Sequence, residues 1–102
     1  MYARITRFAV SPDAIDQLVL ASARHVIPRF EQMEGYAGGS IFADREHGQM
    51  VGIGYWRTLE AVEASAGALE AAGGTGMMFD QPLRVLSQEV FEVAHDHRVP
   101  PG

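Results

Sequence analysis

The stretch QMVGIGYWRTLEAVEAS, residues 49–65, begins as an apolar strand and ends as the opening of a helix. Gly52 and Gly54 occupy alternate positions of that strand, directly before Trp56. Strand interiors usually avoid glycine, because it packs against nothing and loses the most backbone entropy on folding. Since side chains alternate across a strand, the two glycines share one face with Met50 and Trp56. The stretch therefore predicts a strand that has bulky ends and an open middle on one face.

The residues before this stretch predict a strand followed by a long helix. Residues 2–10 are rich in β-branched and aromatic side chains, which is typical of a strand. The motif SPD at 11–13 supplies an N-cap, a proline at the first helical position and an acid in the first turn. Apolar residues then recur at helical spacing as far as Met33, and Gly35 is the expected stop. Pro28 is expected to kink this helix or to end its regular part.

The rest of the chain predicts a hairpin, a second helix, an apolar loop and a last strand. These elements are residues 36–43 and 49–56 around the turn DREHG, a helix capped by Thr58, the loop 71–82, and residues 83–94. The expected apolar stripe of the second helix consists of Val62, Ala66 and Leu69. We interpret the loop as a mobile lid whose adaptable apolar contacts are Met77, Met78 and Phe79, with simple burial of the loop as the alternative.

The order of elements, β-α-β-β-α-β, indicates the fold. Right-handed crossovers place both helices on one face of a four-stranded antiparallel sheet. The sequence thus predicts one domain over residues 1–94, a ferredoxin-like α+β sandwich, and a C-terminal tail over 95–102. The other sheet face has no cover within the chain and is expected to expose Ile41, Val51, Ile53 and Tyr55. Because water should not meet such a face, we expect a second copy to cover it in a homodimer.

Composition limits the classes of function. The chain has 102 residues, 47% of them apolar and 21% charged, which is typical of one soluble globular domain. The net charge of −5, with scattered acids, argues against nucleic acids and anionic membrane surfaces as partners. Cysteine, lysine and asparagine are absent, which excludes thiolate chemistry, a lysine Schiff base and any step that needs an Asn side chain. Without a signal-like apolar core or a membrane-spanning run, a cytoplasmic location is expected.

The two strands of the hairpin together predict a hollow. Alternation places four residues of the first strand on one face: Tyr36, Gly38, Ser40 and Phe42. Beside the glycines of the next strand, this face leaves a hollow between sheet and helices, walled by Tyr36, Phe42, Met50 and Trp56. One interpretation is a pocket for a flat apolar ligand, with Gly52 and Gly54 as its floor. The alternative is that the glycines let a helix pack closely on the sheet, with the tryptophan as ordinary core.

Four segments in sequence carry a family resemblance: ARITRFAV at 3–10, HVIPRFEQMEGYAGG at 25–39, DREHG at 44–48 and YWRTLEAVEAS at 55–65. Their order and spacing resemble the antibiotic biosynthesis monooxygenase superfamily of small dimeric α+β barrel proteins. The resemblance implies that two copies pair their sheets into a barrel. It also implies that the helix-side hollow of each copy is the substrate pocket, lined by Trp56.

Members of this superfamily include cofactor-independent oxygenases of polycyclic aromatics and haem-degrading enzymes. The resemblance therefore implies a cofactor-independent monooxygenase that binds a small phenolic or quinone-type aromatic, with the substrate supplying the electrons to O₂. A non-catalytic ligand-binding or structural dimer is the alternative. A haem enzyme comes third, because the haem-degrading branch uses an Asn on the first strand and a His on the second helix, and this chain has neither.

The polar candidates for the pocket come from the first helix. His25 and Arg29 lie near its apolar face and could serve as a proton acceptor or an anion clamp. The alternative for both is an exposed helix side chain with water as its partner. On the strands, Arg4, Arg7 and Glu89 are expected to form a cross-strand ion pair rather than a catalytic group. His95 and His97 in the tail lack a third ligand at a known spacing, so no metal site is predicted.

Overall fold

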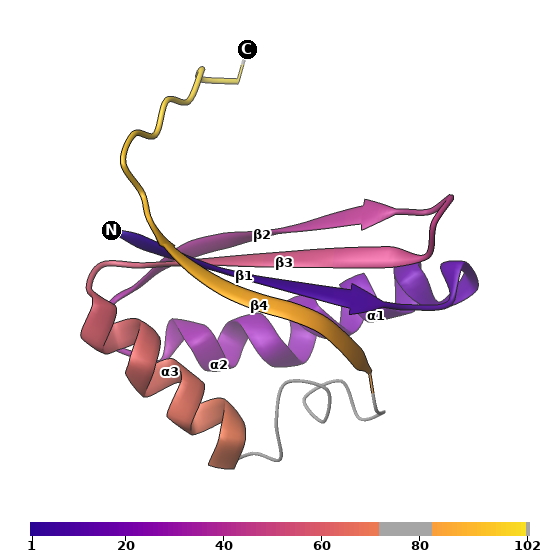
Figure 1. Cartoon of the computed structure of the whole chain (residues 1–102), viewed down its shortest axis with the longest axis horizontal. Coiled ribbons are helices and arrows are strands. Elements are labelled where there is room, and N and C mark those ends of the chain that lie inside the picture. The colour runs from indigo at the N-terminus through magenta and orange to yellow at the C-terminus, as the bar shows by residue number, and fades with distance from the viewer. Residues whose placement is uncertain (72–82, 102) are drawn as a thin grey trace.

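Four antiparallel strands form a single sheet, and the helices of the chain cover one of its faces (Figure 1). The strands are β1 (Tyr2–Ala9), β2 (Tyr36–Asp44), β3 (Gln49–Trp56) and β4 (Arg84–Glu92). Their order across the sheet is β2-β3-β1-β4, so the two central strands come from different halves of the chain. This arrangement confirms the predicted α+β sandwich with a four-stranded antiparallel sheet.

The computed structural model describes residues 1–71 and 83–101, and the side chains of 69–71 lie outside that description. The predicted lid around residues 77–79 therefore lies outside the described residues. No helix in the two described ranges has the length and apolar character that crossing a membrane requires.

One continuous helical run connects β1 to β2, and a further helix follows β3. The run consists of η1 (Pro12–Ala14), α1 (Ile15–Ala21), η2 (Ser22–Val26) and α2 (Ile27–Glu31), and the later helix is α3 (Leu59–Ala71). η2 is a π-helical turn in which the N–H of Ile27 donates to the carbonyl of Ser22. Pro28 comes directly after Ile27 and has no N–H to donate. A π turn before the proline allows the helical run to continue without that hydrogen bond. The regular α-helix thus ends before Pro28, while the run itself continues.

A bulge in β2 shifts its register by one residue. Tyr36 pairs with Trp56, but the next pair joins Gly38 to Tyr55, so that Ala37 is the extra residue. Gly38 has a φ of +127°, a backbone conformation that other residues rarely adopt. Beyond the bulge, the residues of β2 that face the helices are therefore one position later than simple alternation predicts.

This shift overturns the predicted orientations of β2 beyond the bulge, including those of Gly38 and Ser40, which pair with Tyr55 and Ile53. Phe42 pairs with Val51 on the face away from the helices and is 53% exposed, so the prediction that it walls the pocket is wrong. Ile41 instead faces the helices and packs against the core residues Phe8 and Met50. The prediction that Ile41 belongs to the outer face is therefore also wrong, and Phe42 takes that place.

The described residues form two core clusters between the sheet and the helices. The first contains Phe8, Ile15, Leu18 and Met50, and the second contains Trp56, Ala61 and Val62, with Tyr2, Phe30, Met33 and Tyr36 packed against it. On β3 the clusters are anchored by Met50 and Trp56, which are 2% and 0% exposed. Gly52 and Gly54 lie between these anchors on the same face. The open middle predicted from the sequence thus separates two packed regions.

The helix α3 begins at its predicted cap but buries a different stripe. The N–H of Ala61 donates to Thr58 Oγ1 at 3.1 Å, which confirms the N-cap. The buried residues of α3 are Ala61, Val62 and Ser65. Ala66 is exposed, so its predicted place in the apolar stripe is wrong, and the side chain of Leu69 lies outside the described residues. The buried stripe instead includes Ser65, a polar residue that a pattern of apolar residues does not predict.

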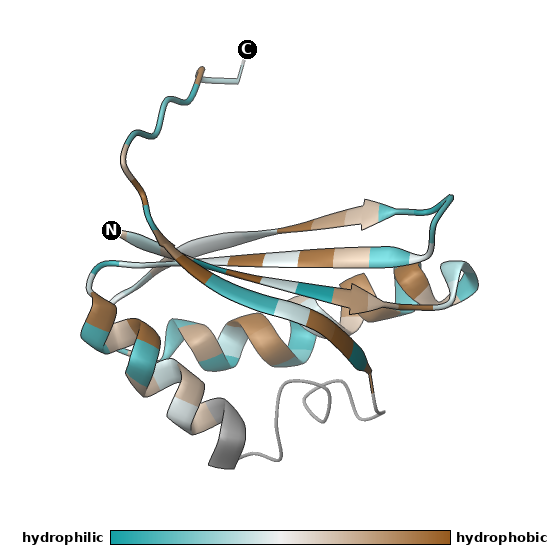
Figure 2. Ribbon diagram, in the orientation of Figure 1, coloured by the Kyte–Doolittle hydropathy of each residue, from teal (hydrophilic) through white to brown (hydrophobic). Residues whose placement is uncertain are grey.

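The face of the sheet opposite the helices carries an apolar surface, which we call the outer face. Its members on β1, β2, β3 and β4 are Ala3, Ile5, Phe42, Val51, Ile53, Tyr55 and Phe91. In the middle of β3, larger residues alternate with glycines (Figure 2). The larger residues Val51, Ile53 and Tyr55 point to the outer face. Phe91 is 52% exposed, as Phe42 is. No element among the described residues covers this face.

The C-terminal residues 93–101 follow β4 without helix or strand and run away from the sheet (Figure 1). The guanidinium of Arg98 lies 5.4 Å from the centre of the Tyr55 ring. No group of three or more His, Cys, Asp or Glu side chains in the described part of the chain is arranged to hold a metal ion, and His95 and His97 form no such group.

Candidate functional site

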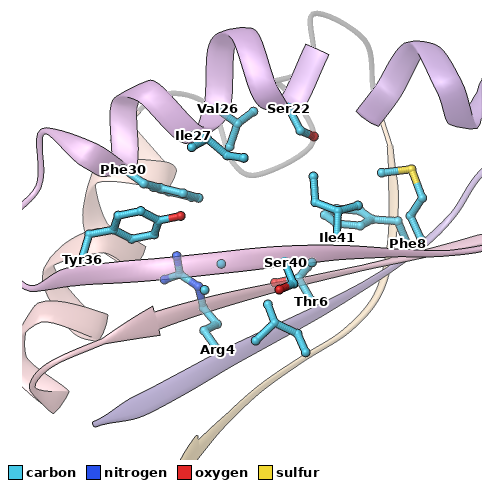
Figure 3. A pocket seen from close by; sticks show the side chains of 15 residues that line it. Arg4, Thr6, Phe8, Ser22, Val26, Ile27, Phe30, Tyr36, Ser40 and Ile41 are labelled. Carbon is cyan, nitrogen blue, oxygen red and sulfur yellow. The ribbon is translucent and has the colours of Figure 1, made fainter. Parts of the chain in front are cut away.

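A cavity of about 90 Å³ lies between the sheet and the helical run, over the middle of β3 (Figure 3). Its floor is formed by Arg4 and Thr6 of β1 and by Gly52 and Gly54 of β3, and its roof includes Ser22, Val26 and Ile27. Phe30 and Tyr36 stand at one end, while Phe8, Ile41 and Met50 stand at the other. The cavity therefore occupies the gap between the two core clusters.

The two glycines of β3 contribute in different ways. A β-carbon at Gly52 would meet no atom within 4 Å, so this glycine opens directly onto the cavity. A β-carbon at Gly54 would lie 3.1 Å from Trp56 Nε1, so this glycine makes room for the indole. Gly52 therefore leaves open space above the strand, whereas Gly54 allows the close packing of Trp56.

Aromatic rings form the end of the cavity near Tyr36. The ring centres of Tyr36 and Trp56 are 5.1 Å apart, and each lies 5.7 Å from the ring centre of Phe30. Trp56 is fully buried behind the other two rings, so it supports this wall rather than lining the cavity. Burial, and secondly the charge of Glu31, raise the pKa of the Tyr36 hydroxyl. Tyr36 therefore keeps its proton and is able to donate a hydrogen bond.

Arg4 is the charged group among the described residues that line the cavity. It is 8% exposed, and its Nη1 donates to Ser65 Oγ at 2.7 Å and to the carbonyl oxygen of Val62 at 3.4 Å. The guanidinium carbon lies 5.7 Å from the ring centre of Trp56 and 5.9 Å from that of Phe30. Burial lowers the pKa of Arg4, because it removes water from the cation.

No carboxylate among the described residues forms an ion pair with Arg4. Hydrogen bonds to Ser65 and contacts with aromatic faces compensate only part of the cost of burying this charge. The predicted cross-strand pair exists, but it joins Arg7 to Glu89, 3.9 Å apart on the outer face. Arg4 points to the opposite face and lines the cavity, and its hydrogen bonds to described residues use Nη1 alone. An anionic ligand would supply the missing negative charge.

The two catalytic candidates of the sequence lie elsewhere. His25 and Arg29 are both exposed, and neither lines the cavity. The physical reason is the π turn, which closes its hydrogen bonds over five residues and so changes which side chains face the sheet. Ser22 and Val26 are the buried residues of η2. The proposal that His25 or Arg29 acts in the pocket is therefore wrong.

Arg4 is the residue that sequence reasoning missed. Strict alternation along β1 places Arg4, Thr6 and Phe8 on one face. Arg4 is paired across the sheet with Gly54, whose orientation the sequence does predict. The sequence therefore contained one sign of this site. Arg4 lies on the same face of the sheet as Gly52 and Gly54, and its partner Gly54 has no side chain to fill the space beside it.

Comparisons with known proteins support the fold. No protein-family model matches the chain. An uncharacterised protein of Mycobacterium tuberculosis, Rv2558, is 29% identical over 99 residues, which cover 95% of this chain and 42% of that protein. The chain thus spans less than half the length of this curated relative.

Three solved structures share the fold at low sequence identity. The haem degrader MhuD of Mycobacterium tuberculosis has a TM-score of 0.72 and 20% identity, over 96% of this chain and all of that one. The monooxygenase ActVA-Orf6 of Streptomyces coelicolor, solved with nanaomycin D, has a TM-score of 0.68 and 14% identity, over 99% of this chain and 92% of that one. SnoaB of Streptomyces nogalater, a cofactor-independent oxygenase, has a TM-score of 0.62 and 15% identity, over 98% of this chain and 97% of that one. The α+β fold that the sequence resemblance implies for a single copy is therefore confirmed.

Substitutions at Gly52 and Gly39 test the cavity. Gly52→Val should keep or raise the free energy of unfolding, because valine favours a strand and enters open space. Gly39→Ala should lower it by about 1–3 kcal/mol, because the new β-carbon would lie 2.7 Å from the carbonyl oxygen of Ile53. Chemical denaturation measures both. A large loss of stability in Gly52→Val and in Gly52→Ala would contradict an open cavity.

Proposed function

We propose that the chain binds a small phenolic or quinone-type aromatic in this cavity and acts on it as a cofactor-independent monooxygenase. The observation that carries the proposal is Arg4, a buried cation at the cavity without a carboxylate partner among the described residues. An aromatic ligand with an ionised oxygen matches both the apolar walls and this charge. As part of the proposal, the protein works as a homodimer, and a cytoplasmic location stays a prediction from the sequence.

The size of the cavity limits the part of a ligand that enters. Its volume of about 90 Å³ is below the roughly 150 Å³ of a cavity known to hold benzene. One ring would therefore fill the cavity with small movements of side chains such as Met50, which is flexible. Further rings of a polycyclic ligand would have to lie outside it. We propose that the ring bearing the acidic oxygen is the one that enters.

The lining residues favour a ligand anion but supply no ordinary base. Among the described residues, those that line the cavity include no histidine, aspartate or glutamate. Tyr36 holds its proton, because its pKa is raised. The protein therefore acts through Arg4, whose positive charge lowers the free energy of the ionised ligand. The ligand proton would pass to water, and phenols whose own structure makes them acidic are the best substrates.

The proposed reaction needs no electrons from the protein. For a simple phenol, the phenolate transfers electrons to O₂, a carbon–oxygen bond forms at the position para to the hydroxyl, and the O–O bond breaks. One oxygen atom stays in the quinone and the other leaves in water, so phenol plus O₂ gives quinone plus water. The apolar walls would exclude bulk water from the reacting ring.

The fold likeness to MhuD does not extend to the residues expected of a haem degrader. The chain has no asparagine, and the segment of α3 has no histidine. A porphyrin is also far larger than the single ring that the cavity accommodates. We therefore propose a phenolic ligand rather than haem.

Oxygen uptake tests the proposed reaction. With 1-naphthol and a metal chelator present, the protein should consume one O₂ for each 1,4-naphthoquinone formed, well above the rate without protein. Gly52→Val, in which the cavity is filled, should lose this activity while staying folded. An oxygen electrode and the quinone absorbance follow the reaction. Binding of the naphthol without any protein-dependent oxygen uptake would favour the non-catalytic alternative.

A matched pair of arginine variants tests the role of charge. Arg4→Met keeps a long apolar stem but should weaken the binding of 4-nitrophenolate by about tenfold or more. Arg7→Met removes the same charge from the outer face and should leave binding unchanged. Calorimetric titration above the pKa of the phenol measures both affinities. Equal affinities in the two variants would contradict the proposed role of Arg4.

A substitution on the outer face tests the proposed dimer. Val51→Asp should convert the protein to monomers at dilute concentration, because it would bury an unpaired carboxylate between two sheets. Ala64→Asp adds the same charge on the exposed side of α3 and should leave the assembly intact. Light scattering coupled to size exclusion measures the mass. A monomeric wild-type protein would contradict the paired sheets.

A further inference from the structure

Two buried hydroxyl groups line the cavity without a partner in the protein. Thr6 of β1 is 7% exposed and Ser22 of η2 is 3% exposed, and both belong to the cavity lining. Among the described residues, neither hydroxyl has a hydrogen-bond partner. The polar atoms that are both unpaired and fully enclosed lie elsewhere, at Trp56 and Ser87. The oxygens of Thr6 and Ser22 therefore remain accessible from the cavity.

The two hydroxyls come from opposite walls of the cavity, and local structure turns each of them inward. Thr6 is paired across the sheet with Gly52, the glycine that opens onto the cavity, so its side chain stands beside open space. Ser22 begins the π turn η2 and is one of its two buried residues. Such π turns within helices are frequent at functional sites. The floor and the roof of the cavity thus contribute one hydroxyl each.

These hydroxyls and the charge of Arg4 occupy different parts of the cavity. The guanidinium carbon of Arg4 lies 5.9 Å from the ring centre of Phe30. Figure 3 shows this guanidinium toward Phe30, whereas Thr6 and Ser22 lie toward Phe8. Arg4 and Thr6 are two residues apart on one face of β1, which separates their Cα atoms by about 6.6 Å. A single aromatic ring with one substituent at Arg4 would therefore turn its opposite side to the hydroxyls.

A hydroxyl differs from a guanidinium in the ligand atoms that it accepts. The guanidinium has donors only, whereas the hydroxyl of serine or threonine both donates and accepts a hydrogen bond. The hydroxyl part of the cavity thus suits a protonated oxygen as well as a carbonyl oxygen. An apolar ring edge would exclude water from this part and leave both hydroxyls unpaired, which costs free energy. A second ligand oxygen at that edge would instead give them a partner.

We propose that Thr6 and Ser22 form a subsite for a second ligand oxygen, para to the oxygen that faces Arg4. The inference rests on the proposed function, because it assumes an aromatic ligand whose ionised oxygen lies at Arg4. It goes further by naming the substitution pattern that the cavity recognises, a ring with oxygens at opposite positions. In the proposed reaction O₂ delivers one oxygen atom to this para position, so the subsite would hold the new oxygen of the product.

Three small phenols of similar acidity test the subsite. Hydroquinone carries the second oxygen at the para position, and resorcinol carries it at the meta position. In 4-fluorophenol, fluorine replaces the para oxygen and is a poor hydrogen-bond acceptor. Calorimetric titration at a single pH, without oxygen, measures the three affinities. Hydroquinone should bind about fivefold more tightly than each of the other two, which is the gain expected from one neutral hydrogen bond.

Variants assign this preference to the two hydroxyls. Thr6→Val and Ser22→Ala should each remove most of the preference for hydroquinone over 4-fluorophenol. Both should keep or raise the free energy of unfolding, because neither hydroxyl has a partner among the described residues to lose. Ser11→Ala is the matched control, since Ser11 is exposed, makes no side-chain cap and does not line the cavity. It should keep the full preference.

Each other outcome contradicts a different part of the inference. A preference for hydroquinone that survives in both variants would overturn the assignment to Thr6 and Ser22. An affinity for hydroquinone no higher than that for 4-fluorophenol or for resorcinol would overturn the para subsite and leave phenol binding in place. Binding of none of the three phenols would overturn the proposed function and this inference together.

Discussion

The inner face of β3 constrains the rest of the site. Large side chains at Met50 and Trp56 each anchor a packed cluster, and the two glycines between them pack no side chain against the helices. Because the core is built in two parts, a cavity lies at the centre of a small domain without breaking the layer above it. A larger residue at Gly52 would join the clusters, which is how an ordinary sandwich of this size would be packed.

The buried arginine depends on this divided core. Arg4 reaches across the face of the sheet to the buried side of α3, where Ser65 accepts its hydrogen bond. Only one of its nitrogens is used in these contacts, and its positive charge faces aromatic rings rather than a carboxylate. The arrangement costs stability in the empty protein and becomes favourable when an anion occupies the cavity. Such a balance is typical of binding sites rather than of structural ion pairs.

Sequence patterns were sufficient for the fold and for the open position at Gly52. The order of strands and helices, the cap at Thr58 and the alternation along β3 all depend on neighbouring residues, and all agree with the structure. The wrong assignments of Ile41 and Phe42 have one cause, a bulge that inserts an extra residue at Ala37. Strict alternation cannot include such an insertion, although the Gly38-Gly39 pair beside it was a visible sign.

The polar site was harder to predict because it depends on long-range contacts. His25 and Arg29 were chosen from ideal helix geometry, which the π turn before Pro28 alters. Arg4 was expected to join a cross-strand ion pair, because oppositely charged residues on neighbouring strands commonly pair. Only the packing of β1 under α3 shows that its partner is Ser65, 61 positions away in the chain.

A crystal structure of the protein grown with 4-nitrophenol, above the pKa of the phenol, tests the central claim most directly. The account predicts one ring over Gly52, between the two core clusters, with its ionised oxygen within hydrogen-bonding distance of Arg4. An empty cavity, with the ring on the outer face of the sheet or with Arg4 turned to a carboxylate of its own chain, would contradict it.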